Sequence, residues 1–168
     1  DSFILYNLKN WYRSSGLSGY SQYIDSSVGF CNDRNMASGS SWSSQPSSAI
    51  YYATYERLIT NKSPSFTCIS SDLMQEPVGL ITADEVAFAG GVYGTRNRSF
   101  YLYSELAYWT MSPSIFAGLY SYVLYVSSNS LDSEEVNTEL NIRPVINLSS
   151  NVTITGSGTS TDPYTVVS

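Results

Sequence analysis

The chain of 168 residues contains no histidine, and this absence removes much candidate chemistry. Without histidine there is no Ser-His-Asp or Cys-His catalytic arrangement, no histidine-ligated zinc, and no imidazole to act as a general base near neutral pH. Cysteine is scarce as well: two residues, Cys31 and Cys68, are too few for a four-cysteine zinc site within one chain. We therefore expect neither a metal nor a cofactor.

Charge is also sparse, because only 13% of the residues are Asp, Glu, Lys or Arg. Acids outnumber bases by 14 to 8, which gives a net charge of −6. Binding to a nucleic-acid backbone requires a basic face, so we expect no nucleic-acid partner. In addition, no apolar run approaches the roughly 18 residues of a membrane span.

The enzymatic hypothesis that remains is a hydrolase with two carboxylates, because the sequence has no glycine-rich phosphate loop. Its candidates are the adjacent pairs Asp84-Glu85 and Glu134-Glu135. Adjacent side chains on a helix point to different faces, so such a pair does not converge on one bond of a substrate. We therefore expect that the protein is not an enzyme.

The two cysteines lie 37 positions apart in a chain that is rich in Ser, Thr and Tyr and poor in Lys. This composition favours one structural disulfide, Cys31–Cys68, in a secreted or cell-surface protein. Two buried free thiols are the alternative, and the sequence leaves it open.

The first residues predict an amphipathic helix. Its apolar residues recur at a spacing of three to four, and they are Phe3, Ile4, Leu5, Leu8, Trp11 and Tyr12. Asp1 or Ser2 can cap its start, and Gly16 can end it in the left-handed conformation.

The middle of the chain is mixed. Residues 50–60 fit a helix or a strand, and residues 66–69 predict a short strand that carries Cys68. Residues 77–81 predict a buried strand. Thr82 and Glu85 then form the pattern of a capping box, which begins a short helix that ends at Gly90-Gly91.

The C-terminal half predicts short strands separated by turns. Their β-rich runs are 100–103, 108–111, 122–126, 145–148, 152–155 and 164–167. A helix early in the chain and strands late in it indicate an α+β fold.

Several segments carry a resemblance to a known group of proteins. They are Leu80–Gly91, Tyr108–Pro113, Ile142–Leu148 and the ending Thr153–Tyr164. In this order they resemble surface proteins of gut Firmicutes, whose C-terminal part is similar to the formylglycine-generating-enzyme type of C-type lectin fold. Many members of this group resemble type IV pilins, with a long hydrophobic N-terminal helix.

The resemblance implies a domain organisation and a location. Residues 1–16 would be the end of a pilin-type helix, whose membrane-spanning half is removed here and would be the only contact with a membrane. Residues 17–168 would form a single C-type-lectin-like ligand-binding domain. The protein would then be extracellular, on the bacterial cell surface and associated with pili.

The resemblance also implies a variable segment at about 104–142. The fold is known as a scaffold for hypervariable binding proteins, which retroelements diversify by randomising adenines in Asn-type codons. In this segment framework-type residues such as Trp109 and Pro113 alternate with an arbitrary mixture of other types. The lectin-type calcium ligands do not match, because Val78 stands where the Glu-Pro-Asn pattern has Asn.

Tyr, Ser and Asn are the residues that recognition loops use, because Tyr supplies rigid area and Ser and Asn supply adaptable hydrogen bonds. The predicted ligand-binding residues all lie in this segment: Leu106, Tyr108, Ser114, Ile115, Ala117, Leu119, Tyr120, Tyr122, Asn137, Thr138, Leu140 and Asn141. Each tyrosine could instead pack across strands or cover the edge of the core.

Two functions fit these residues. The first is an adhesin-like or receptor-like protein that binds an unknown protein or glycan at a cell or phage surface. The second is a structural subunit of a pilus or surface layer, whose Tyr-rich face associates with other subunits.

Overall fold

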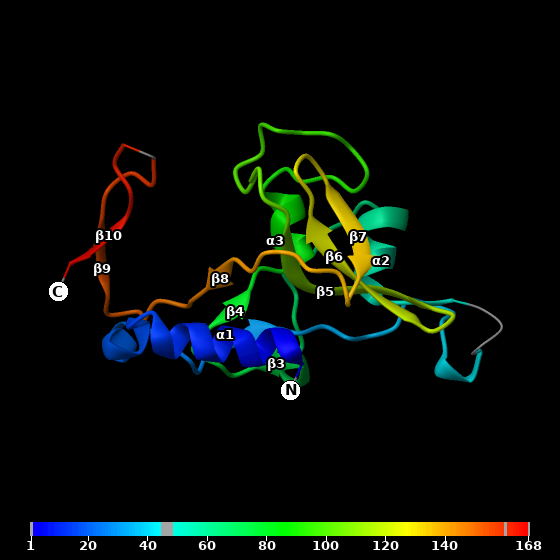
Figure 1. Ribbon diagram of the computed structural model, residues 1–168, viewed down its shortest axis with the longest axis horizontal. Coiled ribbons are helices and arrows are strands. Elements are labelled where there is room, and N and C mark those ends of the chain that lie inside the picture. Colours follow the sequence, from blue (N-terminus) through cyan, green and yellow to red (C-terminus); the bar gives the residue numbers. More distant parts are fainter. Residues whose placement is uncertain (1, 45–48, 160, 168) are drawn as a thin grey trace. The chain divides into compact units, whose positions relative to one another are not determined.

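The computed structural model describes residues 2–44, 49–159 and 161–167, and its mixture of helix and strand confirms the α+β class (Figure 1). In chain order the elements are α1 (Phe3–Ser14), the 3-10 helix η1 (Leu17–Tyr23), β1 (Phe30–Cys31), the 3-10 helix η2 (Trp42–Ser44), β2 (Ile50–Tyr51), α2 (Ala53–Tyr55), the π-helix η3 (Glu56–Thr60), the 3-10 helix η4 (Ser70–Asp72), β3 (Leu73–Met74), β4 (Gly79–Leu80), α3 (Ala83–Phe88), β5 (Tyr108–Ala117), β6 (Tyr120–Val126), β7 (Leu131–Glu135), β8 (Pro144–Val145), β9 (Thr153–Thr155) and β10 (Thr165–Val167).

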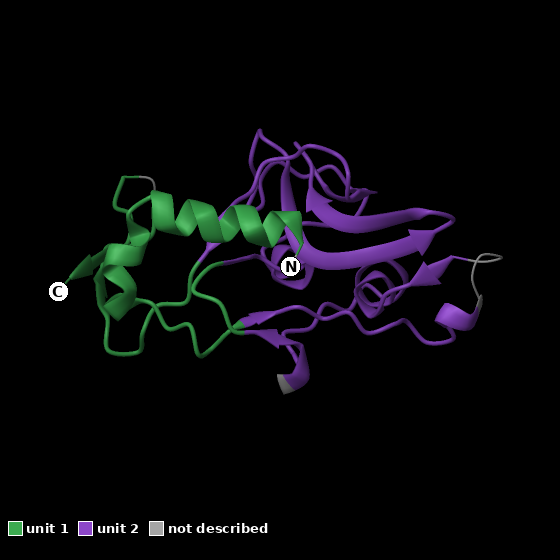
Figure 2. Cartoon of the chain, turned by 60° about the horizontal axis from the view of Figure 1, so that its bottom comes forward, with its two compact units in different colours: residues 1–29, 75–78, 146–168 green, residues 30–74, 79–145 purple. Residues whose placement is uncertain are grey.

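The chain divides into two compact units, which Figure 2 shows in different colours. Unit 1 comprises residues 1–29, 75–78 and 146–168, and unit 2 comprises residues 30–74 and 79–145. Both ends of the sequence therefore belong to unit 1, and the whole segment 104–142 belongs to unit 2. No helix in the described parts of the chain is both long enough and apolar enough to cross a membrane.

Unit 1 contains the predicted amphipathic helix. The Ser2 hydroxyl accepts a hydrogen bond from the Leu5 N–H and caps the start of α1, while Leu8 and Tyr12 are buried. Gly16 has a φ of +79°, the left-handed conformation that ends the helix and that favours glycine. The predicted helix and both of its ends are confirmed.

The C-terminal end of unit 1 is a two-stranded antiparallel ribbon. Strands β9 and β10 pair with Ile154 opposite Val166, and all six of their residues are exposed. A two-stranded ribbon without a covered face is marginally stable by itself.

Unit 2 is built on a four-stranded antiparallel sheet in the order β2-β5-β6-β7. Helix α3 and the π-helix η3 contribute apolar side chains that pack with this sheet, and Thr82 and Glu85 form the predicted capping box at the start of α3. The resulting core comprises Leu58, Ala83, Val86, Phe100, Tyr108, Leu124, Val126 and Leu131.

Pro113 interrupts the regular pairing of the central strand β5. The register between β5 and β6 shifts on both sides of Pro113, so that Ser114 is an extra residue between two paired positions. Proline cannot donate a ladder hydrogen bond, and within a sheet it is confined to edges and bulges.

Two predicted strands are wrong. Residues 66–69 form no strand, because β3 is the partner that pairs with β1. Residues 100–103 form a turn instead, in which the Tyr103 N–H donates to the Phe100 carbonyl and the Phe100 ring enters the core. In the second case tertiary packing overrides the strand propensity of aromatic residues.

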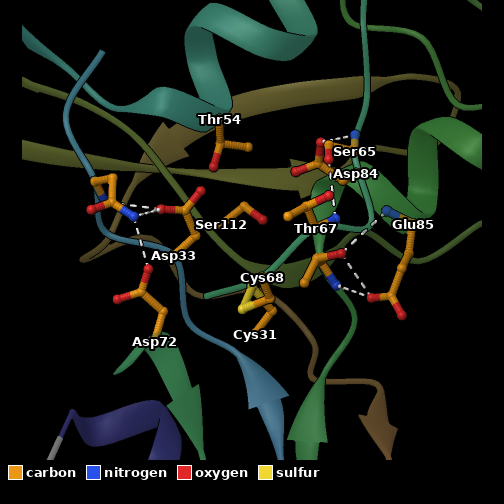
Figure 3. Close-up of a disulfide and its surroundings, with 12 residues drawn as sticks. Cys31, Asp33, Thr54, Ser65, Thr67, Cys68, Asp72, Asp84, Glu85 and Ser112 are labelled. Atoms are coloured by element: carbon orange, nitrogen blue, oxygen red, sulfur yellow. Dashed lines mark hydrogen bonds between the residues drawn. A yellow bond between two sulfur atoms is a disulfide. The ribbon is translucent and has the colours of Figure 1, made fainter. Parts of the chain in front are cut away.

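Cys31 and Cys68 form the predicted disulfide, with their Cα atoms 5.8 Å apart (Figure 3). A polar network lies in the same region. The Arg57 guanidinium binds both carboxylate oxygens of the buried Asp84 at 3.1 and 2.9 Å, and it reaches the Asp33 carboxylate at 2.8 Å. Asp84 also accepts the Ser65 N–H at 2.9 Å.

The Asp33 carboxyl is held in its charged form. Burial acts to raise its pKa, but hydrogen bonds from Asn35 and the Arg57 guanidinium outweigh burial, so the net shift of the pKa is downward. The pKa of Arg57 is raised, chiefly by its hydrogen bond to Asp84. Both shifts favour the ionised network.

Reduction of the disulfide is expected to lower the free energy of unfolding by about 4 kcal/mol, because the bridge closes a long loop in the unfolded chain. Urea unfolding with and without reductant measures this difference. The double variant Cys31→Ser/Cys68→Ser should be equally destabilised and insensitive to reductant. Two alkylatable thiols in the native protein, detected by intact mass, would contradict the bridge.

Candidate functional site

The structure places the twelve predicted site residues at three levels of burial. The exposed residues are Leu106, Leu119, Tyr120, Asn137 and Asn141. The half-buried residues are Ile115, Ala117, Tyr122, Thr138 and Leu140. The buried residues are Tyr108 and Ser114.

Tyr108 was expected to face a ligand, but it belongs to the core and is only 2% exposed. Its hydroxyl donates to the Leu102 carbonyl at 2.7 Å, and the Arg143 guanidinium lies over its ring, 5.3 Å from the centroid. Burial raises the pKa of this hydroxyl, against the opposing effect of Arg143. A buried hydroxyl with a partner costs little, which is why a tyrosine is accommodated here.

Ser114 was also expected at the surface, and it is 0% exposed. Ser114 continues the alternation in which Tyr108, Thr110 and Ser112 of β5 are buried. Its carbonyl accepts the Tyr52 N–H at 3.0 Å. Its hydroxyl has no hydrogen-bond partner within the described residues. The alternation of the sequence places Tyr108 and Ser114 on the same face of β5, but it does not show which of the two faces the core covers.

The remaining predicted residues fall into two groups at opposite ends of β5. At the start of β5, Asn141 forms a parallel bridge with Tyr108, and its N–H donates to the Ala107 carbonyl. Leu106 and Leu140 are the chain neighbours of these residues. At the far end of β5, Ile115 pairs with Tyr122 and Ala117 pairs with Tyr120.

The far end of the sheet presents one continuous row of side chains. Tyr51 of β2 pairs with Ile115 of β5, which pairs with Tyr122 of β6, which pairs with Glu135 of β7. Directly paired residues share a face of the sheet, so these four side chains lie side by side. Together with Ala117 and Tyr120, which form the next pair on this face beyond Phe116 and Ser121, we call them the tip face.

The turn that joins β5 and β6 explains the most exposed residue of the segment. Gly118 and Leu119 form a two-residue loop between the paired Ala117 and Tyr120, and Gly118 has a φ of +62°. A positive φ at the first loop position is the condition that glycine satisfies in type II′ hairpins. Leu119 follows it outside the sheet and is 89% exposed, and Tyr120 is 53% exposed.

The structure adds aromatic residues that the sequence prediction did not include. The ring of Tyr55 lies 4.7 Å from that of Tyr51 beside the tip face, and the exposed Trp42 packs against Phe116 with centroids 5.4 Å apart. Phe116 is the strand neighbour of Ile115 and therefore points to the opposite face. In the sequence Trp42 is an isolated aromatic residue among serines and a glycine. This isolation is the feature that could have marked Trp42 as a candidate site residue.

Glu135 gives the tip face its charge. The Tyr122 hydroxyl donates to the Glu135 carboxylate at 3.2 Å. Partial desolvation raises the pKa of Tyr122, and Glu135 raises it further, so Tyr122 is a neutral phenol at pH 7. The tip face therefore combines phenol rings, aliphatic side chains and one carboxylate.

The acidic strand β7 is the edge of the sheet. The Ser133 and Glu135 N–H groups donate to the carboxylates of the residues just before them, Asp132 and Glu134, at 2.9 and 3.0 Å. Side chains thus satisfy backbone donors that another strand could have used. Charged edge strands of this kind discourage pairing with a further strand.

Unit 1 contains a separate concave feature, a groove of about 300 Å³. Its walls come from η1 and the C-terminal segment, with Leu17, Tyr20, Tyr23, Ile146, Leu148 and Val166. None of the twelve predicted residues lines it. Apart from the tyrosine hydroxyls, no described side chain in its walls can orient a ligand by hydrogen bonds.

Within the described ranges, no three Asp, Glu, Cys or His side chains gather to hold a metal ion. The arrangement on the tip face can provide apolar contact, aromatic contact and one hydrogen-bonding anion.

Comparison with known family models, with curated proteins and with solved structures finds no match to this chain.

Two substitutions on the same hairpin should differ in their effect on stability. Ser114→Leu should lower the free energy of unfolding by about 1–3 kcal/mol, because it overpacks a fully buried position. Leu119→Ser should change it by no more than about 0.5 kcal/mol, because the leucine makes no core contact. Urea unfolding of both variants measures the difference, and equal losses would show that the turn is part of the core.

Proposed function

We propose that this is a surface-displayed ligand-binding protein, adhesin-like or receptor-like, which uses the tip face and Leu119 to contact a protein or glycan. The observation that carries the proposal is the open end of the sheet. There Leu119 and Tyr120 are exposed, although unit 2 has its own buried core elsewhere on the same strands. Exposed apolar anchors that the core does not require are typical of contact sites.

The chemistry of the surface supports the same proposal. Tyrosine contributes a large rigid contact area at a small entropic cost, and it keeps a polar hydroxyl for orientation. Four tyrosines lie on or beside the tip face: Tyr51, Tyr55, Tyr120 and Tyr122. The strands beneath them are fixed by ladder pairing, which limits the ordering that binding requires.

The finer parts of the proposal come from the resemblance of the sequence. We propose a C-type-lectin-like scaffold, diversification of the segment 104–142 by a retroelement, and display on a bacterial cell surface through a pilin-type helix. The disulfide Cys31–Cys68 is compatible with an oxidising extracellular environment. Closely related genes that differ mainly at Asn-type codons of this segment would support the diversification.

The double variant Leu119→Ser/Tyr120→Ser is expected to lose binding at least tenfold while it unfolds like the parent, because hot spots concentrate in aromatic and apolar anchors. The probes are a glycan array and a phage-displayed library of random peptides. The matched control is Tyr101→Ser, an equally drastic change at a residue of unit 2 that is 77% exposed and lies outside the segment. Probes that bind the double variant and the parent equally well would contradict the proposal.

A second candidate function is self-association in a pilus or surface layer, and the exposed ribbon β9–β10 favours it. An unpaired strand edge with exposed Ile154 and Val166 is a template for pairing with another chain. In that case sedimentation velocity should show a mass that rises with protein concentration, and Val166→Lys should abolish the rise. A monomer at all concentrations would exclude self-association of this chain.

A further inference from the structure

The distribution of charge along the chain is uneven in a way that bears on the ligand. The segment 104–142 contains five acids, namely Glu105, Asp132, Glu134, Glu135 and Glu139, and no Lys or Arg. The rest of the chain contains nine acids and eight bases. Five of the six net negative charges therefore belong to the segment that forms the hairpin, the edge strand β7 and the return to Asn141.

Within the part of the chain that the structure describes, no ion pair includes any of these five acids. The salt bridges of the described residues join Lys9 to Glu76 and Arg57 to Asp33 and Asp84. Arg34 lies close enough to Tyr52, the neighbour of Tyr51, to act to lower its pKa against the larger effect of burial. Arg96 and Arg98 flank Asn97, whose N–H donates to the Asn129 carbonyl just before β7 begins, at the end of β7 away from Glu135.

The acidic residues of β7 raise the pKa of nearby tyrosines. Burial is the main cause of the raised pKa of Tyr93 and Tyr125, and Asp132 raises both further. Glu135 acts in the same direction on Tyr122. At the tip face the neutral phenol of Tyr122 therefore lies in the negative potential of Glu135, which strengthens its attraction for a cation, while Asp132 acts on Tyr93 and Tyr125 toward the other end of β7.

The exposed apolar side chains of this surface indicate which kind of cationic ligand it can bind. A bare metal ion would need converging oxygen ligands, and the described carboxylates do not gather in that way. A metal ion or a small polyamine would also leave Leu119 and Tyr120 without apolar contact. A polypeptide supplies both components, because Lys and Arg carry a charge on an aliphatic stem and have apolar neighbours in the chain.

We infer that the ligand of the tip face is a basic segment of another protein, whose Lys or Arg side chains lie against the tyrosines and pair with Glu135 while apolar side chains cover Leu119 and Tyr120. This inference rests on the proposed function and specifies its partner. The edge of β7 does not take part as a strand template, because Asp132 and Glu134 satisfy its outer N–H groups. Binding thus occurs through side chains, in a negative field that attracts a basic partner and repels an acidic one.

The test is a selection of phage-displayed random 12-residue peptides on the whole chain. Peptides that bind the parent and not Leu119→Ser/Tyr120→Ser should contain more Lys and Arg than the unselected library. A recovered peptide, made synthetically, should bind Glu135→Gln roughly tenfold more weakly, since a hydrogen bond to a charged group is lost. Its affinity for the parent should also fall as the salt concentration rises.

The matched control is Glu105→Gln, which changes the net charge of the same segment equally but lies before the start of β5. It should weaken binding less than twofold. Urea unfolding of each variant establishes that the fold is intact. The amide of Glu135→Gln can still accept from Tyr122, so a general disruption of the sheet is not expected.

Three other outcomes overturn the inference. Peptides that depend on Leu119 and Tyr120 but show no enrichment of Lys and Arg contradict the basic partner and leave the proposed function standing. If Glu135→Gln and Glu105→Gln weaken peptide binding equally, the effect comes from net charge alone, and the proposed pairing of the ligand with Glu135 is wrong. If no peptide depends on the hairpin, the inference fails, and the absence of any hairpin-dependent glycan then removes the proposed function as well.

Discussion

The contact between Arg57 and Asp84 is the constraint on which the arrangement of unit 2 depends. Asp84 is buried in the first turn of α3 and would be strongly destabilising there as an unpaired charge. Arg57 of η3 binds both of its oxygens and also reaches Asp33, while Ser65 donates to Asp84 from a third segment. The network therefore fixes the helices that pack with the sheet, and it joins them to the chain beside Cys31. The disulfide Cys31–Cys68 also restricts the conformation of this region by a covalent bond.

The sheet that rests on this framework has two different ends. At one end Tyr108, Leu124 and Val126 belong to the core, and at the other end Tyr120 and Leu119 are exposed. The same two strands, β5 and β6, supply both ends. The bulge at Pro113 lies between them and allows the strand to change its side-chain register without a break in the sheet. A stable core and a replaceable surface can therefore coexist on one hairpin.

Much of the fold was predictable where the signal is local. The capping box of Thr82 and Glu85, the cap by Ser2 and the left-handed Gly16 are confirmed, because each depends on residues within one turn of the chain. The strands expected at 66–69 and 100–103 were wrong, because strand formation depends on a partner that local sequence does not specify. Most of the predicted site residues are exposed or half-buried, but Tyr108 and Ser114 are not, and Trp42, Tyr51 and Tyr55 were missed.

The sequence by itself determined the absence of histidine chemistry, the excess of acidic residues in 104–142, the amphipathic first helix and the presence of a cysteine pair. Composition and short-range spacing are sufficient for these properties. Only the tertiary structure decided that Ser114 turns inward, that Tyr108 fills the core, and that Tyr51, Ile115, Tyr122 and Glu135 form one row. These facts depend on strand register and on a bulge, which bring together residues as far apart as 51 and 135. Register is set by the packing of a whole sheet face, so no local pattern could supply it.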